Sequence, residues 1–160
     1  MTDLLPRLEA YALERADYPA LCDTEEQTKI TLINPYLEVL GFDVRNPKAV
    51  RLEFSTGVGK IAERVDYAII RDGNPVILIE AKSATASTES SAHLHQIRRY
   101  AQDAPTVRFA ALTNGVKWRW YHKSGDGRLS DEPFMICDTF CAEGHRRQVP
   151  RDRQRRSNIV

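Results

Sequence analysis

The sequence predicts an α/β fold in which a mixed central sheet is flanked by helices. Between Glu63 and Ser83, two apolar runs rich in β-branched residues, 65–70 and 76–79, read as strands on either side of turn-forming residues 72–75. Both faces of this hairpin are apolar, and such a sheet has to be covered on both sides. Segments with helical periodicity precede and follow it. With 160 residues, 42% of them hydrophobic, the chain can form one domain with a core.

Two helices are predicted before the first strand. The first is a short amphipathic helix over 3–17. The second begins at Thr24, a favourable N-cap residue, and ends at Gly41. Proline inside a helical pattern removes a hydrogen bond, so Pro35 predicts a kink or a break near Asn34. The apolar stripe of this helix is predicted to consist of Ile30, Ile33, Leu37 and Leu40.

Strands and one further helix make up the rest of the chain. Thr88 is the expected N-cap of a helix that runs to about Gln102, and Asn114-Gly115 is a hairpin-turn sequence. The order is helix, strand, strand, strand, helix, strand, followed by a C-terminal hairpin, in a single domain that we expect to span 1–144. Besides the central hairpin, strands are predicted at 42–44, 49–54, 106–113, 116–121 and 134–137.

Charged residues gather at one end of the central hairpin. With the turn centred on its glycine, Ile70 pairs with Val76 and Asp66 pairs with Glu80. Side chains alternate along a strand, so Asp66, Glu80 and Lys82 project from the same face. Like charges directly opposite one another destabilise a sheet, which predicts a compensating divalent cation at this position.

These residue types suit metal-assisted cleavage of a phosphodiester bond. Mg²⁺ prefers hard oxygen ligands and is usually held by one or two carboxylates together with water. Asp66 and Glu80 are the predicted ligands, and the backbone carbonyl of Ala81 is a third. Lys82 would orient or help deprotonate the attacking water, or bind the scissile phosphate. The alternative interpretation is a salt bridge at the strand ends, which contributes little to stability when it is exposed.

An acidic residue in the helix after Thr24 is a further candidate. Extending the apolar stripe backwards from Ile30 directs Glu26 inward or toward a cleft, whereas Glu25 points more outward. Glu26 is equally suited to a structural role, because an acid in the first turn interacts favourably with the helix dipole.

The composition restricts the setting of the protein. No segment approaches the roughly 20 apolar residues of a membrane span, and the charged N-terminus lacks the apolar core of a signal peptide. Three cysteines in no paired framework suit a reducing compartment, so we expect a cytoplasmic protein. Residues 145–160 hold six arginines and one aspartate, a balance of +5, which leaves −4 for the rest. We expect this tail to be disordered and either to meet an anionic partner or to be solvated.

The segments VDYAII and PVILIEAKS resemble the D…E-x-K core of the PD-(D/E)xK nuclease superfamily. More narrowly, the chain resembles the N-terminal nuclease domain of type I restriction enzyme R subunits. Besides the hairpin, the segments that carry the resemblance are TEEQTKITLINPYLEVLGFDV, QIRRY and FAALTNGVKWRWY, in this order, from about Thr24 to Phe140. It implies a restriction-endonuclease-like αβββαβ sandwich, which agrees with the predicted order of elements.

By this resemblance, Asp66, Glu80 and Lys82 match the catalytic triad of the superfamily. Gln96 and Tyr100 stand four residues apart and so share one face of a helix. By themselves they read as an exposed polar flank. The resemblance matches them to a Q-x-x-x-Y motif that helps to position the DNA or the active site.

The resemblance also bears on the metal ligands, because an acidic residue of the first helix often assists metal binding in these nucleases. Glu26 is the first choice for this role, Glu25 aligns equally well, and Glu53 is a weaker candidate.

The function implied by the resemblance is that of a Mg²⁺-dependent endonuclease of the restriction or defence type that hydrolyses DNA, with Mn²⁺ as a substitute metal. The 160 residues contain no ATP-driven translocase motor. The alternative is therefore a non-cleaving nucleic-acid-binding or regulatory module that needs a partner motor subunit. The expected partners are DNA and a separate translocase or specificity subunit. A homodimer would help a one-site protein to cut two strands, although no residue argues for it.

Overall fold

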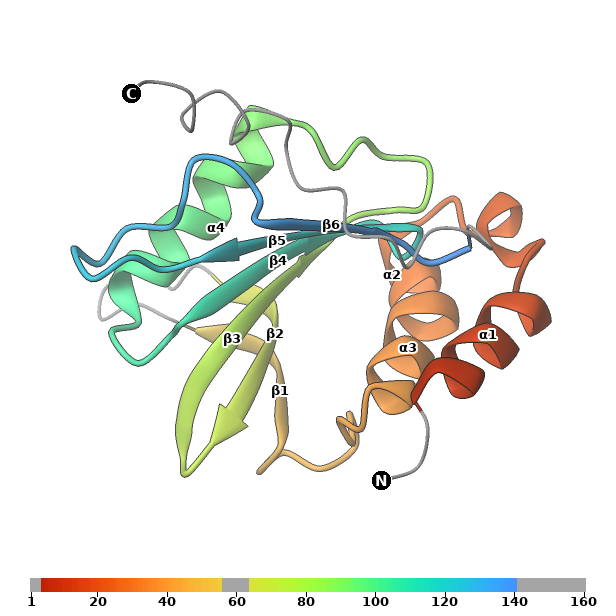
Figure 1. Cartoon of the computed structure of the whole chain (residues 1–160), viewed down its shortest axis with the longest axis horizontal. Coiled ribbons are helices and arrows are strands. Elements are labelled where there is room, and N and C mark those ends of the chain that lie inside the picture. Colours follow the sequence, from red (N-terminus) through yellow and green to blue (C-terminus); the bar gives the residue numbers. More distant parts are fainter. Residues whose placement is uncertain (1–3, 56–63, 141–160) are drawn as a thin grey trace, which may run out of the picture.

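A six-stranded sheet lies between two layers of helices (Figure 1). The computed structural model describes residues 4–55 and 64–140; the predicted basic tail at 145–160 lies outside this part of the chain. Among the described residues, none of the helices combines the length and the apolar composition of a membrane span.

The helical layer before the sheet is built from residues 4–39. Thr24 caps α2 (Glu25–Thr28), the start of the predicted second helix, because Oγ1 of Thr24 accepts a hydrogen bond from the backbone N–H of Gln27 at 3.1 Å. The segments are α1 (Leu4–Glu14), the 3₁₀ turn η1 (Tyr18–Leu21), α2 (Glu25–Thr28), the π-helical turn η2 (Lys29–Ile33) and α3 (Asn34–Val39).

The π turn stands where Pro35 predicts a break. The backbone N–H of Asn34 donates to the carbonyl of Lys29, five residues earlier, instead of four. The additional residue in this turn changes the phase of the helix. Ile30, predicted to lie in the apolar stripe, is 63% exposed, whereas Lys29 and Leu32 are buried.

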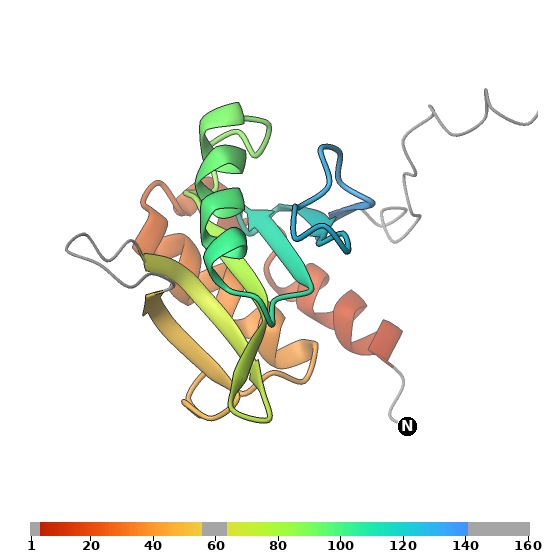
Figure 2. The ribbon, with the colours of Figure 1, turned by 90° about the vertical axis from the view of Figure 1, so that its left-hand side faces the viewer.

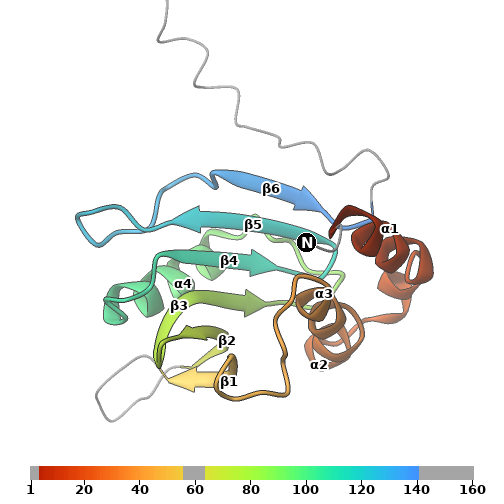
Figure 3. The same cartoon turned by 60° about the horizontal axis from the view of Figure 1, so that its bottom comes forward.

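The strands follow one another across the sheet in sequence order, from β1 to β6 (Figure 3). Only β3 and β4 are parallel, and α4 (Ser91–Asp103) forms the crossover between them, so the sheet is mixed as predicted. The segment 42–44 is a loop, and the strand predicted there is wrong. The strands are β1 (Val50–Ser55), β2 (Arg64–Arg71), β3 (Asn74–Ala81), β4 (Phe109–Thr113), β5 (Lys117–His122) and β6 (Met135–Asp138).

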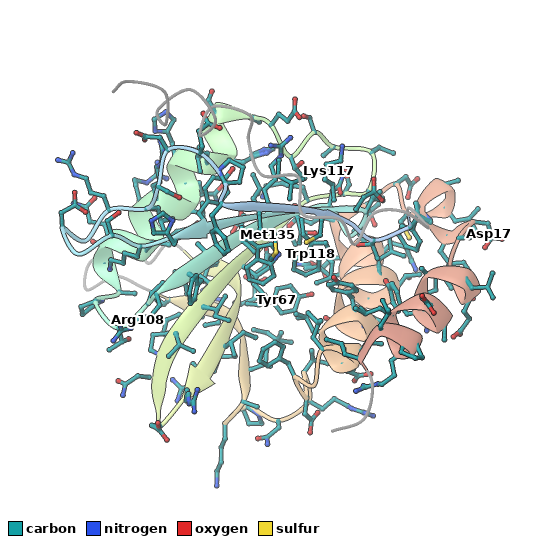
Figure 4. All side chains as sticks on the ribbon, viewed as in Figure 1. Asp17, Tyr67, Arg108, Lys117, Trp118 and Met135 are labelled. Carbon is teal, nitrogen blue, oxygen red and sulfur yellow. The ribbon has the colours of Figure 1, made fainter. Side chains whose placement is uncertain are left out.

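Both faces of the sheet are covered, as the apolar hairpin predicts. Helix α4 packs on one face through Ile97 and Ala101, and α1 and α3 pack on the other, as the two perpendicular views show (Figures 1 and 2). Tyr67 and Trp118 lie in the middle of the second core, between the sheet and the N-terminal helices (Figure 4). This two-sided burial fixes the central strands and therefore the residues at their ends.

The central hairpin has a tighter turn than predicted. Asp72 and Gly73 both have positive φ angles, 52° and 78°, and form a two-residue turn. Ile70 therefore pairs with Pro75 and not with Val76. A bulge between residues 69 and 70 shifts the register by one, so Tyr67 pairs with Ile79 as the predicted register requires.

The start of α4 also differs from the prediction. The N-cap is Ser90 and not Thr88. Oγ1 of Thr88 instead accepts a hydrogen bond from Nε of Arg119 at 3.1 Å, so this hydroxyl joins the loop before α4 to strand β5.

Candidate functional site

The candidate site lies where β2 begins and β3 ends. The regular pairing of these strands stops at Tyr67 and Ile79. One residue further, Oδ2 of Asp66 accepts a hydrogen bond from the backbone N–H of Ala81 at 2.7 Å. A side-chain carboxylate thus satisfies a backbone donor at the end of the ladder. This bond holds Asp66, which is 8% exposed, beside the carboxyl end of β3.

Glu80 and Lys82 form a close pair at the same end of the sheet. Nζ of Lys82 donates to Oε1 of Glu80 at 2.7 Å, and the two side chains are only 14% and 4% exposed. The other carboxylate oxygen of Glu80, Oε2, is buried and has no hydrogen-bond partner among the described residues. The structure thus brings Asp66, Glu80 and Lys82 together, as the hairpin register predicts.

The environment changes the proton affinity of this pair. Burial raises the pKa of Glu80 to about 7; the hydrogen bond from Lys82 opposes this shift and the charge of Asp66 adds to it. Burial by itself would lower the pKa of Lys82, but the hydrogen bond to Glu80 and the nearby carboxylates raise it. Lys82 therefore stays an ammonium group at neutral pH.

A second buried ammonium group, that of Lys29, also lies at the site. Nζ of Lys29 is 3.1 Å from Oδ1 of Asp66, and the Lys29 side chain is 11% exposed. Sequence reasoning missed Lys29, because the predicted apolar stripe ran through Ile30. Its spacing of four residues from Glu25 was the available signal, since residues at i and i+4 share a helix face.

The acidic residues near α2 are arranged around the two lysines. Glu26 forms an ion pair with Lys29, and its side chain is 74% exposed. Glu25 lies between the lysines, with Oε2 3.7 Å from Nζ of Lys82 and Oε1 3.9 Å from Nζ of Lys29. Oε1 of Glu53, in β1, is 3.6 Å from Nζ of Lys29. Of the two helix acids considered, Glu25 is the one that contacts both lysines.

Gln96 and Tyr100 form a fixed pair on α4. Nε2 of Gln96 donates to the hydroxyl of Tyr100 at 2.8 Å, and Tyr100 is 3% exposed. They share a helix face, as their spacing predicts. His93, in the first turn of this helix, has a pKa that burial and the nearby charge of Lys82 lower.

Asn114 holds the loop that follows Lys82. Its Nδ2 donates to the carbonyl oxygens of Ala84 and Ala86 at 3.2 and 2.9 Å. Oγ1 of Thr28 accepts from the backbone N–H of Ala84 at 3.0 Å, which joins the same loop to α2. Sequence reasoning missed these roles, since the pattern identified Asn114 only as a turn residue.

The turn that contains Asn114 is itself displaced by one residue from the prediction. The backbone N–H of Asn114 donates to the carbonyl of Lys117 at 3.3 Å, which puts Gly115 and Val116 at its centre. Oδ1 of Asn114 accepts from the backbone N–H groups of Val116 and Lys117, at 3.1 and 2.8 Å. The side chain of Asn114 thus stabilises both the turn and the neighbouring loop.

The donor set suits a hard divalent cation. Two adjacent carboxylates, with the backbone carbonyl of Ala81 between Glu80 and Lys82, match the few protein ligands that Mg²⁺ takes alongside water. The unpartnered Oε2 of Glu80 is a buried oxygen of the required kind. Within the described part of the chain, no three or more His, Cys, Asp or Glu side chains are arranged so that they could hold a metal ion by themselves.

A family model described as the N terminus of type I restriction enzyme R proteins matches residues 24–132, more than half of the chain. The chain belongs to this family. The resemblance to the N-terminal domain of type I restriction enzyme R subunits is thereby confirmed, and membership links the chain to restriction systems. The comparisons with curated proteins and with solved structures gave no match. The segment matched to the R-protein N terminus begins at Thr24 and includes every candidate site residue discussed above.

Proposed function

We propose that the chain is a Mg²⁺-dependent endonuclease that hydrolyses phosphodiester bonds in DNA, built on a restriction-endonuclease-like αβββαβ core. The observation that carries the proposal is the buried oxygen Oε2 of Glu80, next to Asp66 and Lys82, which has no hydrogen-bond partner among the described residues. A buried carboxylate oxygen without a partner is costly unless it binds something. A divalent cation offers the strongest compensation at this position.

Each residue of the triad has a distinct part in this proposal. Asp66 and Glu80 hold the metal, with the carbonyl of Ala81 as a further oxygen ligand. The bound Mg²⁺, or Mn²⁺ in its place, supplies Lewis-acid chemistry. Lys82 stays an ammonium group, so it donates hydrogen bonds to a nonbridging phosphate oxygen and does not accept a proton from water.

Other residues of the site act by positioning. The pair of Gln96 and Tyr100 presents a rigid polar group from α4, and we assign it to orientation of the DNA backbone. Glu25 or Glu26 is the assisting acid from α2; the contact of Glu25 with Lys82 favours Glu25. DNA and the other subunits of a restriction enzyme are the partners that R proteins of this family imply.

A non-cleaving module that needs a partner motor subunit is the second candidate. One observation favours it: both carboxylate oxygens of Asp66 are already engaged, Oδ1 by Lys29 and Oδ2 by the backbone N–H of Ala81. Such a module would not cleave by itself. Contact with DNA or with a partner subunit would first have to break the bonds of Asp66 to Lys29 and to Ala81.

Plasmid cleavage tests the proposal. We expect the parent protein to cut DNA with Mg²⁺ and not with excess EDTA. Asp66→Asn and Lys82→Met should each reduce the rate by at least about 100-fold, the usual cost of losing one electrostatic group of an active site. Asp17→Asn is the control, since Asp17 lies at the outer edge of the N-terminal helices (Figure 4).

The outcomes separate the two candidates. Equal cleavage by the parent and by both triad variants refutes the nuclease assignment. Binding of Mn²⁺ in a calorimetric titration without cleavage of single- or double-stranded DNA or RNA favours the non-cleaving module. The same reactions repeated with a separate translocase subunit would then show whether a partner switches the site on.

A further inference from the structure

Lys29 is enclosed by the four carboxylates of Glu25, Glu26, Glu53 and Asp66, which we call the acid cluster. Its ammonium nitrogen is in ion-pair contact with all four, at 3.9 Å from Glu25, 3.6 Å from Glu53 and 3.1 Å from Asp66, with a closer contact to Glu26. The lysine is therefore the internal cation of this cluster. The ion pairs with four carboxylates stabilise the charged form of Lys29.

The backbone explains why Lys29 reaches Asp66. Lys29 is the first residue of the π turn, in which the N–H of Asn34 reaches back five residues to the carbonyl of Lys29. Such single turns are frequent at functional sites. On the sheet side, Glu53 lies in β1 between Leu52 and Phe54, which pair with Tyr67 and Val65, and it has a positive φ of 50°, which is uncommon for a residue other than glycine. Two irregular backbone positions thus meet at one ammonium group.

The members of the acid cluster differ in exposure. The side chain of Asp66 is 9% exposed, whereas those of Glu26 and Glu53 are 74% and 54% exposed. Asp66 is also fixed by the backbone N–H of Ala81. The two exposed glutamates have room to move with the ammonium group, and Asp66 does not.

The position of the ammonium group conflicts with metal binding at Asp66. An ion that coordinates Oδ1 of Asp66 at the usual distance of about 2 Å for Mg²⁺ would stand close to the ammonium nitrogen, which lies 3.1 Å from that same oxygen. Two cations at this separation in a poorly solvated site repel each other strongly. The metal and the ammonium group of Lys29 therefore compete for Asp66.

We propose that Lys29 is a displaceable counter-cation: without metal it neutralises Asp66, and on metal binding its ammonium group leaves Asp66 for Glu26 and Glu53. This inference rests on the proposed metal site at Asp66 and Glu80. It assigns Lys29 a positioning role that sets the metal affinity of the site. In this arrangement Glu26 and Glu53 receive the lysine and are not metal ligands.

Calorimetric titration with Mn²⁺ tests the inference without any measurement of cleavage. Lys29→Met keeps much of the apolar stem and removes the charge, so we expect Mn²⁺ to bind tighter by roughly tenfold or more. Lys29→Arg keeps the charge, and its guanidinium group can form bidentate hydrogen bonds with a carboxylate. We therefore expect Mn²⁺ to bind more weakly to this variant. Lys48→Met, at an exposed position before β1, removes the same charge far from Asp66 and should leave the affinity unchanged.

A second set of titrations distinguishes two roles for Glu53: ion-pair partner of the displaced Lys29 ammonium group, or direct ligand of the metal. Glu53→Gln should weaken Mn²⁺ binding in the parent and have no effect in the Lys29→Met background, because no ammonium group then needs a receiver. An equal loss in both backgrounds identifies Glu53 as a direct ligand and overturns the inference.

The remaining outcomes are decisive as well. Unchanged or weaker binding by Lys29→Met overturns the counter-cation role. If circular dichroism shows that Lys29→Met does not fold, Lys29→Arg replaces it as the deciding variant. A Mn²⁺ affinity of Lys29→Arg equal to or above that of the parent then overturns the counter-cation role. If neither the parent nor any variant binds Mn²⁺, the proposed metal site itself fails and the inference fails with it. Binding by the parent with no response to either Lys29 variant rejects this inference alone.

Discussion

The carboxylate of Glu80 should make the metal-free protein less stable as the pH rises. Burial raises the pKa of Glu80 from 4.5 to about 7 in the folded state. At pH values between these two pKa values, Glu80 holds its proton in the folded protein but has lost it in the unfolded chain. The stabilisation is fully present below the unfolded pKa and is lost as the pH rises through about 7. Glu80→Gln removes this titration and keeps an amide oxygen that can accept the hydrogen bond from Lys82.

The size of the effect follows from the shift. The pKa of Glu80 rises from 4.5 to about 7, and each unit corresponds to about 1.4 kcal/mol, so the full contribution is about 3 kcal/mol. The Glu80 side chain is only 4% exposed, so solvent screening reduces this value little. Between about pH 5 and pH 8, the free energy of unfolding of the parent should fall by about 2.5 kcal/mol relative to that of Glu80→Gln.

Urea unfolding in the presence of EDTA, followed by tryptophan fluorescence across this pH range, measures the difference directly. Glu9→Gln, at an exposed position of α1, is the matched control and should run parallel to the parent. Parallel curves for the parent and Glu80→Gln would refute the reasoning, because Glu80 would then titrate alike in the folded and the unfolded chain. In that case the hydrogen bond from Lys82 fully offsets the burial of the carboxylate.

Two further predictions concern the contacts that place α2 and the π turn on the sheet. Gly115 and Gly73 both have φ +78°, but a Cβ at Gly115 would lie 2.8 Å from Cβ of Leu32, whereas nothing lies within 4 Å at Gly73. Gly115→Ala should therefore destabilise the protein by roughly 1–3 kcal/mol more than Gly73→Ala in urea unfolding, and equal losses would contradict this contact. Tyr11→Phe removes a hydroxyl that donates to the buried carbonyl of Leu32 at 2.7 Å, so thermal and urea unfolding should show a loss of about 1–2 kcal/mol. Tyr18→Phe is its control, since the Tyr18 hydroxyl makes no hydrogen bond within the described residues; an equal loss there would rule out the explanation.

The triad could be read from the sequence because its geometry is local. Fourteen positions separate Asp66 from Glu80, and a hairpin with alternating side chains determines their relation almost alone. The predicted turn was wrong by one residue at Ile70, and the bulge beside it restored the register that pairs Tyr67 with Ile79. The position of the acids at the hairpin end was correct because the turn and the bulge shift the register in opposite directions.

The buried face of the helix before the sheet was predicted less accurately, for a physical reason. A regular α-helix advances about 100° per residue, so one additional residue in a turn rotates the rest of the pattern by that amount. The π turn at 29–33 makes such a shift. It buries Lys29 and exposes Ile30, which the apolar stripe had placed inside. In the sequence, the departure from regular helix geometry is signalled only by Pro35, which lies just after the turn, in α3.

By itself, then, the sequence determined the α/β class, the order of the elements, the family, and the gathering of Asp66, Glu80 and Lys82. Periodicity and turn chemistry act over a few residues and need no knowledge of the fold. Only the tertiary structure decided which groups from distant segments meet there. Lys29 and Asp66 are 37 positions apart, and Asn114 and Ala84 are 30 positions apart. Such contacts depend on how the helices and loops pack against the sheet. A small change in the rotation of a helix determines which of its charged side chains contacts the sheet.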